Sequence, residues 1–176
     1  MRHSIFSIPI FVSQIDTKKL NLKSKELKKT WLSQTISNYE SNENKNLDNK
    51  TGQYLLSVIH DAMHEYLEGR KFSMSLKDIW INVYEQNDYQ ETHTHPGSHF
   101  SFTIYKKIDR PHTIFFHPVK NIIQSYYHQT FPELDHFYAP NCKQGDIIIF
   151  PSFLEHMVTR SSACETISGN ILINYE

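Results

Sequence analysis

The sequence predicts a mainly β domain with flanking N-terminal helices, whose core is a jelly-roll barrel (a double-stranded β-helix). Two observations lead to this prediction. Short β-branched and aromatic segments, separated by turn residues, follow one another from residue 78 to the end of the chain, as in sandwiches and barrels. Helical periodicity is confined to the first 70 residues, which disfavours a parallel sheet with alternating helices.

Length and composition indicate a single domain. The chain has 176 residues, of which 39% are hydrophobic and 13% aromatic, enough to fill one core. We expect one domain over residues 1–176, in which an N-terminal strand and helices (1–70) pack on the barrel core (78–175). A net charge of −1 gives no overall field to attract nucleic acid or anionic lipid.

The first predicted elements are a strand and a helix. Residues 5–12 form an apolar run interrupted by Pro9, which is typical of a strand at the edge of a sheet. Ser24 is a suitable helix cap. The residues after it predict a helix whose apolar side comprises Leu27, Trp31 and Leu32.

A change of period marks the start of the barrel. The polar stretch 39–52 predicts a mobile loop. Apolar residues then recur at helical spacing from Gln53 to Leu67, and Gly69 ends that helix. From there the pattern alternates, and it predicts strands over 79–84, 100–105, 113–117, 147–150 and 167–175.

The segment 118–141 breaks the alternation. It carries five aromatic residues among polar ones: Tyr126, Tyr127, Phe131, Phe137 and Tyr138. Long ordered loops between barrel strands often form lids or substrate walls. A satellite cluster or an oligomer contact is an equally good interpretation of this segment.

Two separated segments predict a mononuclear metal site. Alternate side chains of an extended strand share a face, so His93 and His95 can point at one ion. A third ligand, His156, follows the buried strand 147–149 after the chain turns at Pro151. This order of glycine, strand, proline and histidine resembles the segment that supplies the last metal ligand in cupin-type barrels.

Three neutral imidazoles suit Fe(II), Zn, Cu or Ni and leave coordination positions open for a substrate, a cosubstrate or O2. Glu91 lies two residues before His93, on the same strand face. It is interpreted as a fourth ligand, as an acceptor for an imidazole N–H, or as an exposed carboxylate. We predict no catalytic residue beyond the metal ligands.

Further residues around these histidines follow a familiar order: Trp80 and Asn82; His93, His95 and Pro96; Ser98, Ser101 and Tyr105; Gly145, Phe150, Pro151, Ser152 and His156; Ile167, Ser168 and Asn170. In order and spacing they resemble the Fe(II)- and 2-oxoglutarate-dependent oxygenases common in bacteriophages and marine bacteria. The resemblance covers roughly residues 78–175, and no single motif in it is decisive.

The resemblance implies a dioxygenase that decarboxylates 2-oxoglutarate to succinate and CO2 and hydroxylates an unidentified substrate. It makes His93, His95 and His156 the Fe(II) ligands, although many related enzymes use His-x-Asp. A histidine in the carboxylate position leaves the iron site one negative charge poorer. The residues expected to bind the cosubstrate are Asn82, Tyr105, Ser168 and Asn170.

One departure from the family concerns the cosubstrate. The family places an arginine about six residues before the Asn170 equivalent, where Cys164 stands here. Losing that bidentate ion pair costs about 2 to 5 kcal/mol. Lys106 or Arg160 would have to replace it from another direction. The alternative function is therefore a three-histidine dioxygenase, or a non-catalytic metal-binding cupin module, that does not use 2-oxoglutarate.

Location and partners are expectations of the same kind. The only cysteines are Cys142 and Cys164, and we expect free thiols in a cytoplasmic protein rather than one disulfide. We expect a small molecule or a protein side chain as substrate, no membrane partner, and a possible homodimer. Without a strong basic patch, nucleic acid is disfavoured.

Overall fold

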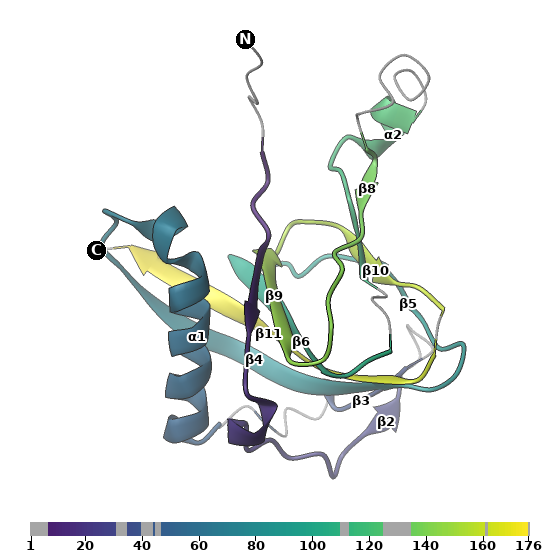
Figure 1. Ribbon diagram of the computed structural model, residues 1–176, viewed down its shortest axis with the longest axis horizontal. Helices are drawn as coiled ribbons and strands as arrows, with labels where there is room; N and C mark the ends of the chain where they lie inside the picture. The colour runs from purple at the N-terminus through teal and green to yellow at the C-terminus, as the bar shows by residue number, and fades with distance from the viewer. Residues whose placement is uncertain are drawn as a thin grey trace.

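Two antiparallel sheets and one long helix build the fold in the computed structural model (Figure 1), which describes residues 7–30, 35–39, 44, 47–109, 113–124, 135–160 and 162–175. The elements in chain order are β1 (Phe11–Gln14), the 3-10 helix η1 (Thr17–Lys19), β2 (Lys28–Lys29), β3 (Ile36–Ser37), α1 (Asn49–Leu67), β4 (Phe72–Tyr84), β5 (Gln90–His93), β6 (Phe100–Lys107), β7 (Thr113–Phe116), α2 (Lys120–Ile122), β8 (Phe137–Tyr138), β9 (Asp146–Pro151), β10 (His156–Val158) and β11 (Cys164–Tyr175).

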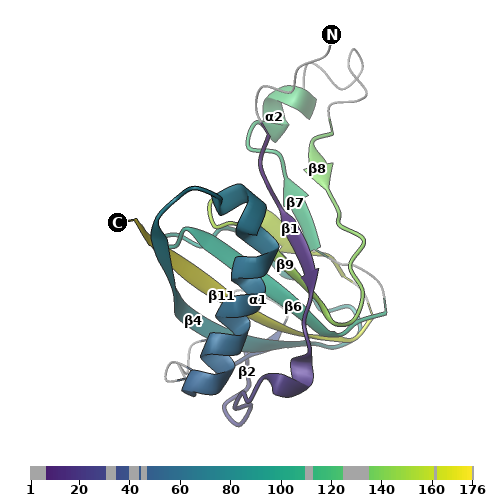
Figure 2. The same cartoon turned by 60° about the vertical axis from the view of Figure 1, so that its left-hand side comes forward.

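The two sheets differ in size. The larger has the strand order β1-β9-β6-β11-β4-β3-β2, and the smaller has the order β5-β10-β7-β8. Helix α1 lies across one face of the larger sheet, and the smaller sheet lies on the other side (Figures 1 and 2). The prediction of a mainly β jelly-roll fold is confirmed.

The outer face of the larger sheet forms an apolar core with α1. Leu55, Ile59 and Met63 of α1 are fully buried, and they belong to one cluster with Phe102 and Ile149 of the sheet. The helix ends as predicted, because Gly69 adopts a φ of 76° that favours glycine. The apolar stripe on α1 therefore holds this face of the sheet.

Alternate side chains of the same strands face inward, toward the smaller sheet. In β9, Ile147 and Ile149 belong to the outer cluster, whereas Ile148 and Phe150 belong to an inner cluster. Gly169 of β11 allows the Phe102 ring of the outer cluster to pack closely, because a Cβ at this position would lie 2.5 Å from that ring and 2.6 Å from the Asp78 carbonyl oxygen. Both faces of the sheet are thus covered.

The helix predicted after Ser24 is wrong for the residues that the structure describes; Trp31 and Leu32 lie outside them. Lys28–Lys29 instead form strand β2, which pairs with β3, and β3 pairs with the long strand β4. A short helix without tertiary contacts is only marginally stable in water. The open edge of β4, in contrast, offers unpaired backbone groups that β3 satisfies.

The mobile loop predicted for 39–52 is also wrong in part. Helix α1 begins at Asn49, because the Asp48 carboxylate accepts a hydrogen bond from the Thr51 backbone N–H at 3.0 Å and caps the helix. Asn44 is buried and donates a hydrogen bond to the Lys23 carbonyl.

Within the described ranges, no helix combines the length and apolarity needed to cross a bilayer.

Candidate metal centre

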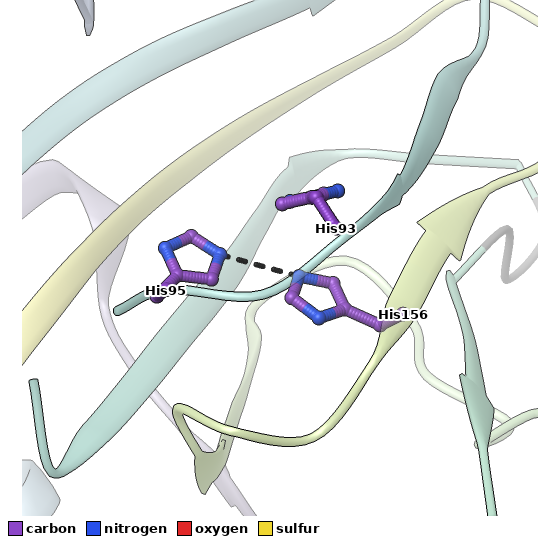
Figure 3. A group of neighbouring side chains, drawn as sticks. All are labelled: His93, His95 and His156. Carbon is purple, nitrogen blue, oxygen red and sulfur yellow. Dashed lines mark hydrogen bonds between the residues drawn. The ribbon is translucent and has the colours of Figure 1, made fainter. Parts of the chain in front are cut away.

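Three histidines from two separate segments meet between the sheets (Figure 3). The potential ligand atoms of His93, His95 and His156 all lie within 4.8 Å of one another. The Nε2 atoms of His95 and His156 are 3.3 Å apart. Two neighbouring ligands with metal–nitrogen bonds of about 2.1 Å lie about 3 Å apart. The spacing of this pair therefore fits two ligands of one ion.

Strand pairing and one further backbone contact set the positions of the rings. His93 ends β5 and pairs with His156 at the start of β10. His95 lies just beyond β5, where its backbone N–H donates to the Ser152 carbonyl at 2.9 Å. His93 and His95 thus reach one centre, although only the first of them belongs to a strand.

Backbone carbonyls orient two of the imidazoles. His93 Nδ1 lies 2.7 Å from the Glu91 carbonyl oxygen, and His156 Nδ1 lies 2.9 Å from the Leu154 carbonyl oxygen. Because a carbonyl can only accept, each Nδ1 carries the proton and each Nε2 keeps its lone pair. The Glu91 group that contacts His93 is this carbonyl, whereas its side chain is exposed.

Side chains orient the third ring through a short polar chain. Asn170 donates to Asp78 Oδ1 at 2.6 Å, and the Ser101 hydroxyl donates to Asn170 Oδ1 at 2.7 Å. The Asn170 side chain also forms a hydrogen bond with His95, and this contact partly offsets the lowering of the His95 pKa by burial. Sequence analysis missed Asp78; its signal was a position two residues before Trp80, on the same strand face.

Burial keeps all three imidazoles neutral. Desolvation is the largest cause in each case: it lowers the pKa of His93, lowers that of His95 to about 4 and lowers that of His156 well below its usual value. Trp80 stacks on His95 with ring centroids 5.8 Å apart, and Phe150 packs against His156 at 4.7 Å. Neutral nitrogens with free lone pairs are the form that binds a metal.

An inner pocket extends from the histidines into the barrel. It is lined by Trp80, Asn82 and Tyr84 of β4, Thr103 and Tyr105 of β6, Thr113 of β7, and Cys164, Thr166 and Ser168 of β11. Its volume is about 20 Å³, which is room for about one water. Three of the four residues predicted to bind the cosubstrate line this pocket.

An outer cavity of about 390 Å³ adjoins the inner pocket, and His93 and His95 line both spaces. Its aromatic wall consists of Tyr39 and Trp80, whose ring centroids lie 4.8 Å apart. Its charged groups are Lys77, Asp78 and Glu91. Asn170, the fourth residue predicted to bind the cosubstrate, lines this cavity instead.

The other candidate residues lie away from the metal centre. Lys106 forms an ion pair with Glu165, and Arg160 stacks over the Tyr89 ring at 4.8 Å, so neither lines the inner pocket. His99 Nδ1 accepts a hydrogen bond from the Ile173 backbone, while His112 and His128 lie outside the described residues. His117 Nδ1 accepts a hydrogen bond from the Val119 backbone N–H.

The segment 118–141 contributes a short helix and a strand, with residues 125–134 outside those described. Its described residues line neither the inner pocket nor the outer cavity. Phe137 and Tyr138 are instead exposed on β8, at the edge of the smaller sheet. Both interpretations of this segment, a lid and a contact surface, therefore remain predictions.

Solved structures of low sequence identity resemble the fold of this chain. A Pseudomonas putida prolyl-4-hydroxylase is similar with a TM-score of 0.51 and 11% identity, over 84% of this chain and 77% of that one. A 2OG-Fe(II) oxygenase family oxidoreductase from Burkholderia pseudomallei is similar with a TM-score of 0.49 and 14% identity over 76% of this chain. The match spans only 57% of that oxidoreductase. No curated protein matches the chain by sequence.

A family comparison gives evidence from the sequence itself. The family described as "Putative 2OG-Fe(II) oxygenase" matches residues 78–168, which is more than half of the chain and contains all three clustered histidines. The family expected from the sequence is thereby confirmed. The chain belongs to the 2OG-Fe(II) oxygenases, whose metal is Fe(II) and whose cosubstrate is 2-oxoglutarate.

Proposed function

We propose that this chain is itself an Fe(II)-dependent dioxygenase that couples the decarboxylation of 2-oxoglutarate to the hydroxylation of an unidentified substrate, with His93, His95 and His156 as iron ligands. The observation that supports the proposal most is the contact between His95 and His156. Their Nε2 atoms lie 3.3 Å apart, and the Leu154 carbonyl holds the proton of His156 on Nδ1, so the His156 Nε2 offers a lone pair. The potential ligand atoms of His93 also lie within 4.8 Å of those of this pair, so the three imidazoles can share one ion.

The donor set fits Fe(II). Imidazole nitrogen is a common ligand of iron, and three imidazoles leave the remaining coordination positions of the ion open. Bound Fe(II) would supply the one-electron chemistry with O2 that no amino-acid side chain provides. Trp80 and Phe150 would keep bulk water away from the ligands, and Asp78 would hold Asn170 against His95.

The inner pocket fits 2-oxoglutarate only in part. Asn82, Tyr105 and Ser168 offer hydrogen-bonding groups, and we propose that they contact the cosubstrate. Charge and space fit less well, because the described residues that line this pocket include no cation and its volume is about 20 Å³. Binding would require side chains to turn aside.

We propose that the substrate occupies the outer cavity. This space adjoins His93 and His95, and its volume of about 390 Å³ suits a small molecule or one protein side chain. Tyr39 and Trp80 would form an apolar wall, with Asp78 as a hydrogen-bond acceptor nearby.

Succinate formation tests the proposal. The purified full chain is loaded anaerobically with Fe(II), and its iron content is measured before 2-oxoglutarate and O2 are added. We expect succinate from the loaded wild type and none from His156→Ala. A wild type that binds iron stoichiometrically, yet forms no succinate at saturating 2-oxoglutarate, would contradict the proposal.

The uncharged inner pocket favours a second candidate. A three-histidine dioxygenase that acts directly on its substrate, or a metal-binding cupin module without turnover, needs no site for a dicarboxylate. Stoichiometric iron without succinate would support this alternative.

We further propose a cytoplasmic location, a phage or marine-bacterial source, a homodimer and a substrate other than nucleic acid. The described cysteines Cys142 and Cys164 are both free, which suits a reducing, cytoplasmic location. The domain organisation into 1–70 and 78–175 is likewise a proposal.

A further inference from the structure

Strand register divides the inner pocket into layers. In the layer beside the histidines, Ser168 of β11 pairs with Trp80 of β4 and with Thr103 of β6. In the next layer, Thr166 pairs with Asn82 and with Tyr105. Cys164 and Tyr84 pair in the layer farthest from the histidines. An elongated ligand that reaches an ion at the histidines would extend its tail toward Cys164.

No layer contains a charged group among the described lining residues. Burial raises the pKa of the Cys164 thiol to about 12, so this group is neutral as well. Two cations that could replace a missing arginine have other partners: Lys106 pairs with Glu165, and Arg160 lies over the Tyr89 ring. A second carboxylate placed in this pocket would therefore have no counter-ion among the described residues that line it.

Neutral donors are nevertheless present. Thr113 accepts a hydrogen bond from the Tyr105 hydroxyl at 2.8 Å, and Thr166 and Ser168 accept from the Asn82 amide at 3.4 Å and 3.3 Å. A hydroxyl that accepts one bond keeps its own proton to donate. These hydroxyls can bond the tail of an oxo acid whether the tail ends in a carboxylate or not.

We propose that the inner pocket recognises the tail of its 2-oxo acid through neutral hydrogen-bond donors, with Cys164 as the specificity-determining residue, so that a charge on the tail adds little affinity. This inference rests on the proposed function, because it assumes that an oxo acid enters the pocket. A buried carboxylate without a counter-ion loses about as much in desolvation as it gains from neutral donors.

Calorimetric titration of the full chain, loaded with Co(II) under anaerobic conditions, tests this inference by binding alone. The two ligands are 2-oxoglutarate and 2-oxopentanoate, which have the same carbon chain but differ in the tail carboxylate. For the wild type we expect dissociation constants within about threefold of each other, because no ion pair distinguishes the two tails.

A pair of variants tests the role of Cys164. Cys164→Arg should tighten 2-oxoglutarate binding by about tenfold or more and leave 2-oxopentanoate unchanged, because arginine would supply a bidentate partner. Cys164→Gln adds length without charge, and it should keep the wild-type ratio. If the arginine variant does not fold, the ratio measured for the wild type still decides the question.

Other outcomes separate this inference from the proposed function. If wild-type protein binds 2-oxoglutarate more than about thirtyfold tighter than 2-oxopentanoate, a charged partner exists; the inference is then overturned and the proposed function stands. If Co(II) binds but neither oxo acid does, the inference and the use of 2-oxoglutarate both fail.

Discussion

The same strands build both faces of the larger sheet, yet one face packs against α1 and the other lines the inner pocket. On the outer face, Phe102 and Ile149 pack against α1 in an apolar cluster. On the inner face, Ser168 and Thr103 carry hydroxyls into a pocket beside the histidines. Alternation along a strand thus separates the residues that stabilise the fold from those that bind ligands. Substitutions on the two faces should therefore have different consequences.

The largest effect is expected on the inner side, at a ligand. His156→Ala should weaken Fe(II) or Co(II) binding by more than about a hundredfold, because a lost ligand costs more than a lost orienting group. Metal content after dialysis measures this effect. His99→Ala is the control, since His99 is exposed and the one described hydrogen bond of its side chain is to the Ile173 backbone N–H. Equal losses in both variants would mean that the metal lies elsewhere.

A substitution on the outer face should affect stability alone. Ile149→Ala removes a fully buried side chain and should lower the free energy of unfolding by about 2 to 5 kcal/mol. Ser168→Ala, on the inner face, should lower it by about 1 kcal/mol or less, because Asn82 retains Thr166 as a partner. Urea titration measures both values. Metal affinity of the folded protein should remain unchanged in Ile149→Ala, and a large loss would show that the faces are coupled.

An intermediate effect is expected where the inner face orients a ligand. Asn170→Ala removes a hydrogen-bond partner of His95 and should weaken metal binding by about tenfold, as is typical of groups that orient a ligand. Competition with a chelator measures this change. Ser168→Ala is the matched control on the same strand, because Ser168 bonds Asn82 and Thr103 rather than a histidine. If both variants lose affinity equally, the chain from Asp78 to His95 has no special role.

The contrast between the faces could largely be predicted from the sequence. Alternation over 79–84 and 100–105 predicts both the strands and their apolar sides, and the spacing of His93 and His95 predicts that they share a centre. The contact between Asp78 and Asn170 depends on the register of β4 with β11, which includes a bulge after Asn170. Register between strands 92 residues apart is set by tertiary packing, so local patterns do not reveal it.

The wrongly predicted first helix has a related cause. Leu27 and the lysines around it show a helical pattern, yet Lys28 and Lys29 pair with β3 at the edge of the larger sheet. The gain in backbone pairing comes from β4, a strand that lies more than forty residues further along the chain. Segments with weak local preference adopt the structure that a distant edge makes favourable.

The smallest effect concerns the stability of the metal-free protein as a function of pH. Burial lowers the pKa of His95 from 6.5 to about 4 and lowers those of His93 and His156 as well. Between these values the unfolded chain binds more protons than the folded one, so stability rises with pH and is lost as the pH falls from about 6.5 toward 4. Urea titrations at pH 7, 6 and 5 should show this loss, with a smaller slope in His156→Ala. A metal-free protein whose stability stays constant over that range would show that the imidazoles are hydrated, and the water-excluding role assigned to Trp80 and Phe150 would then fail.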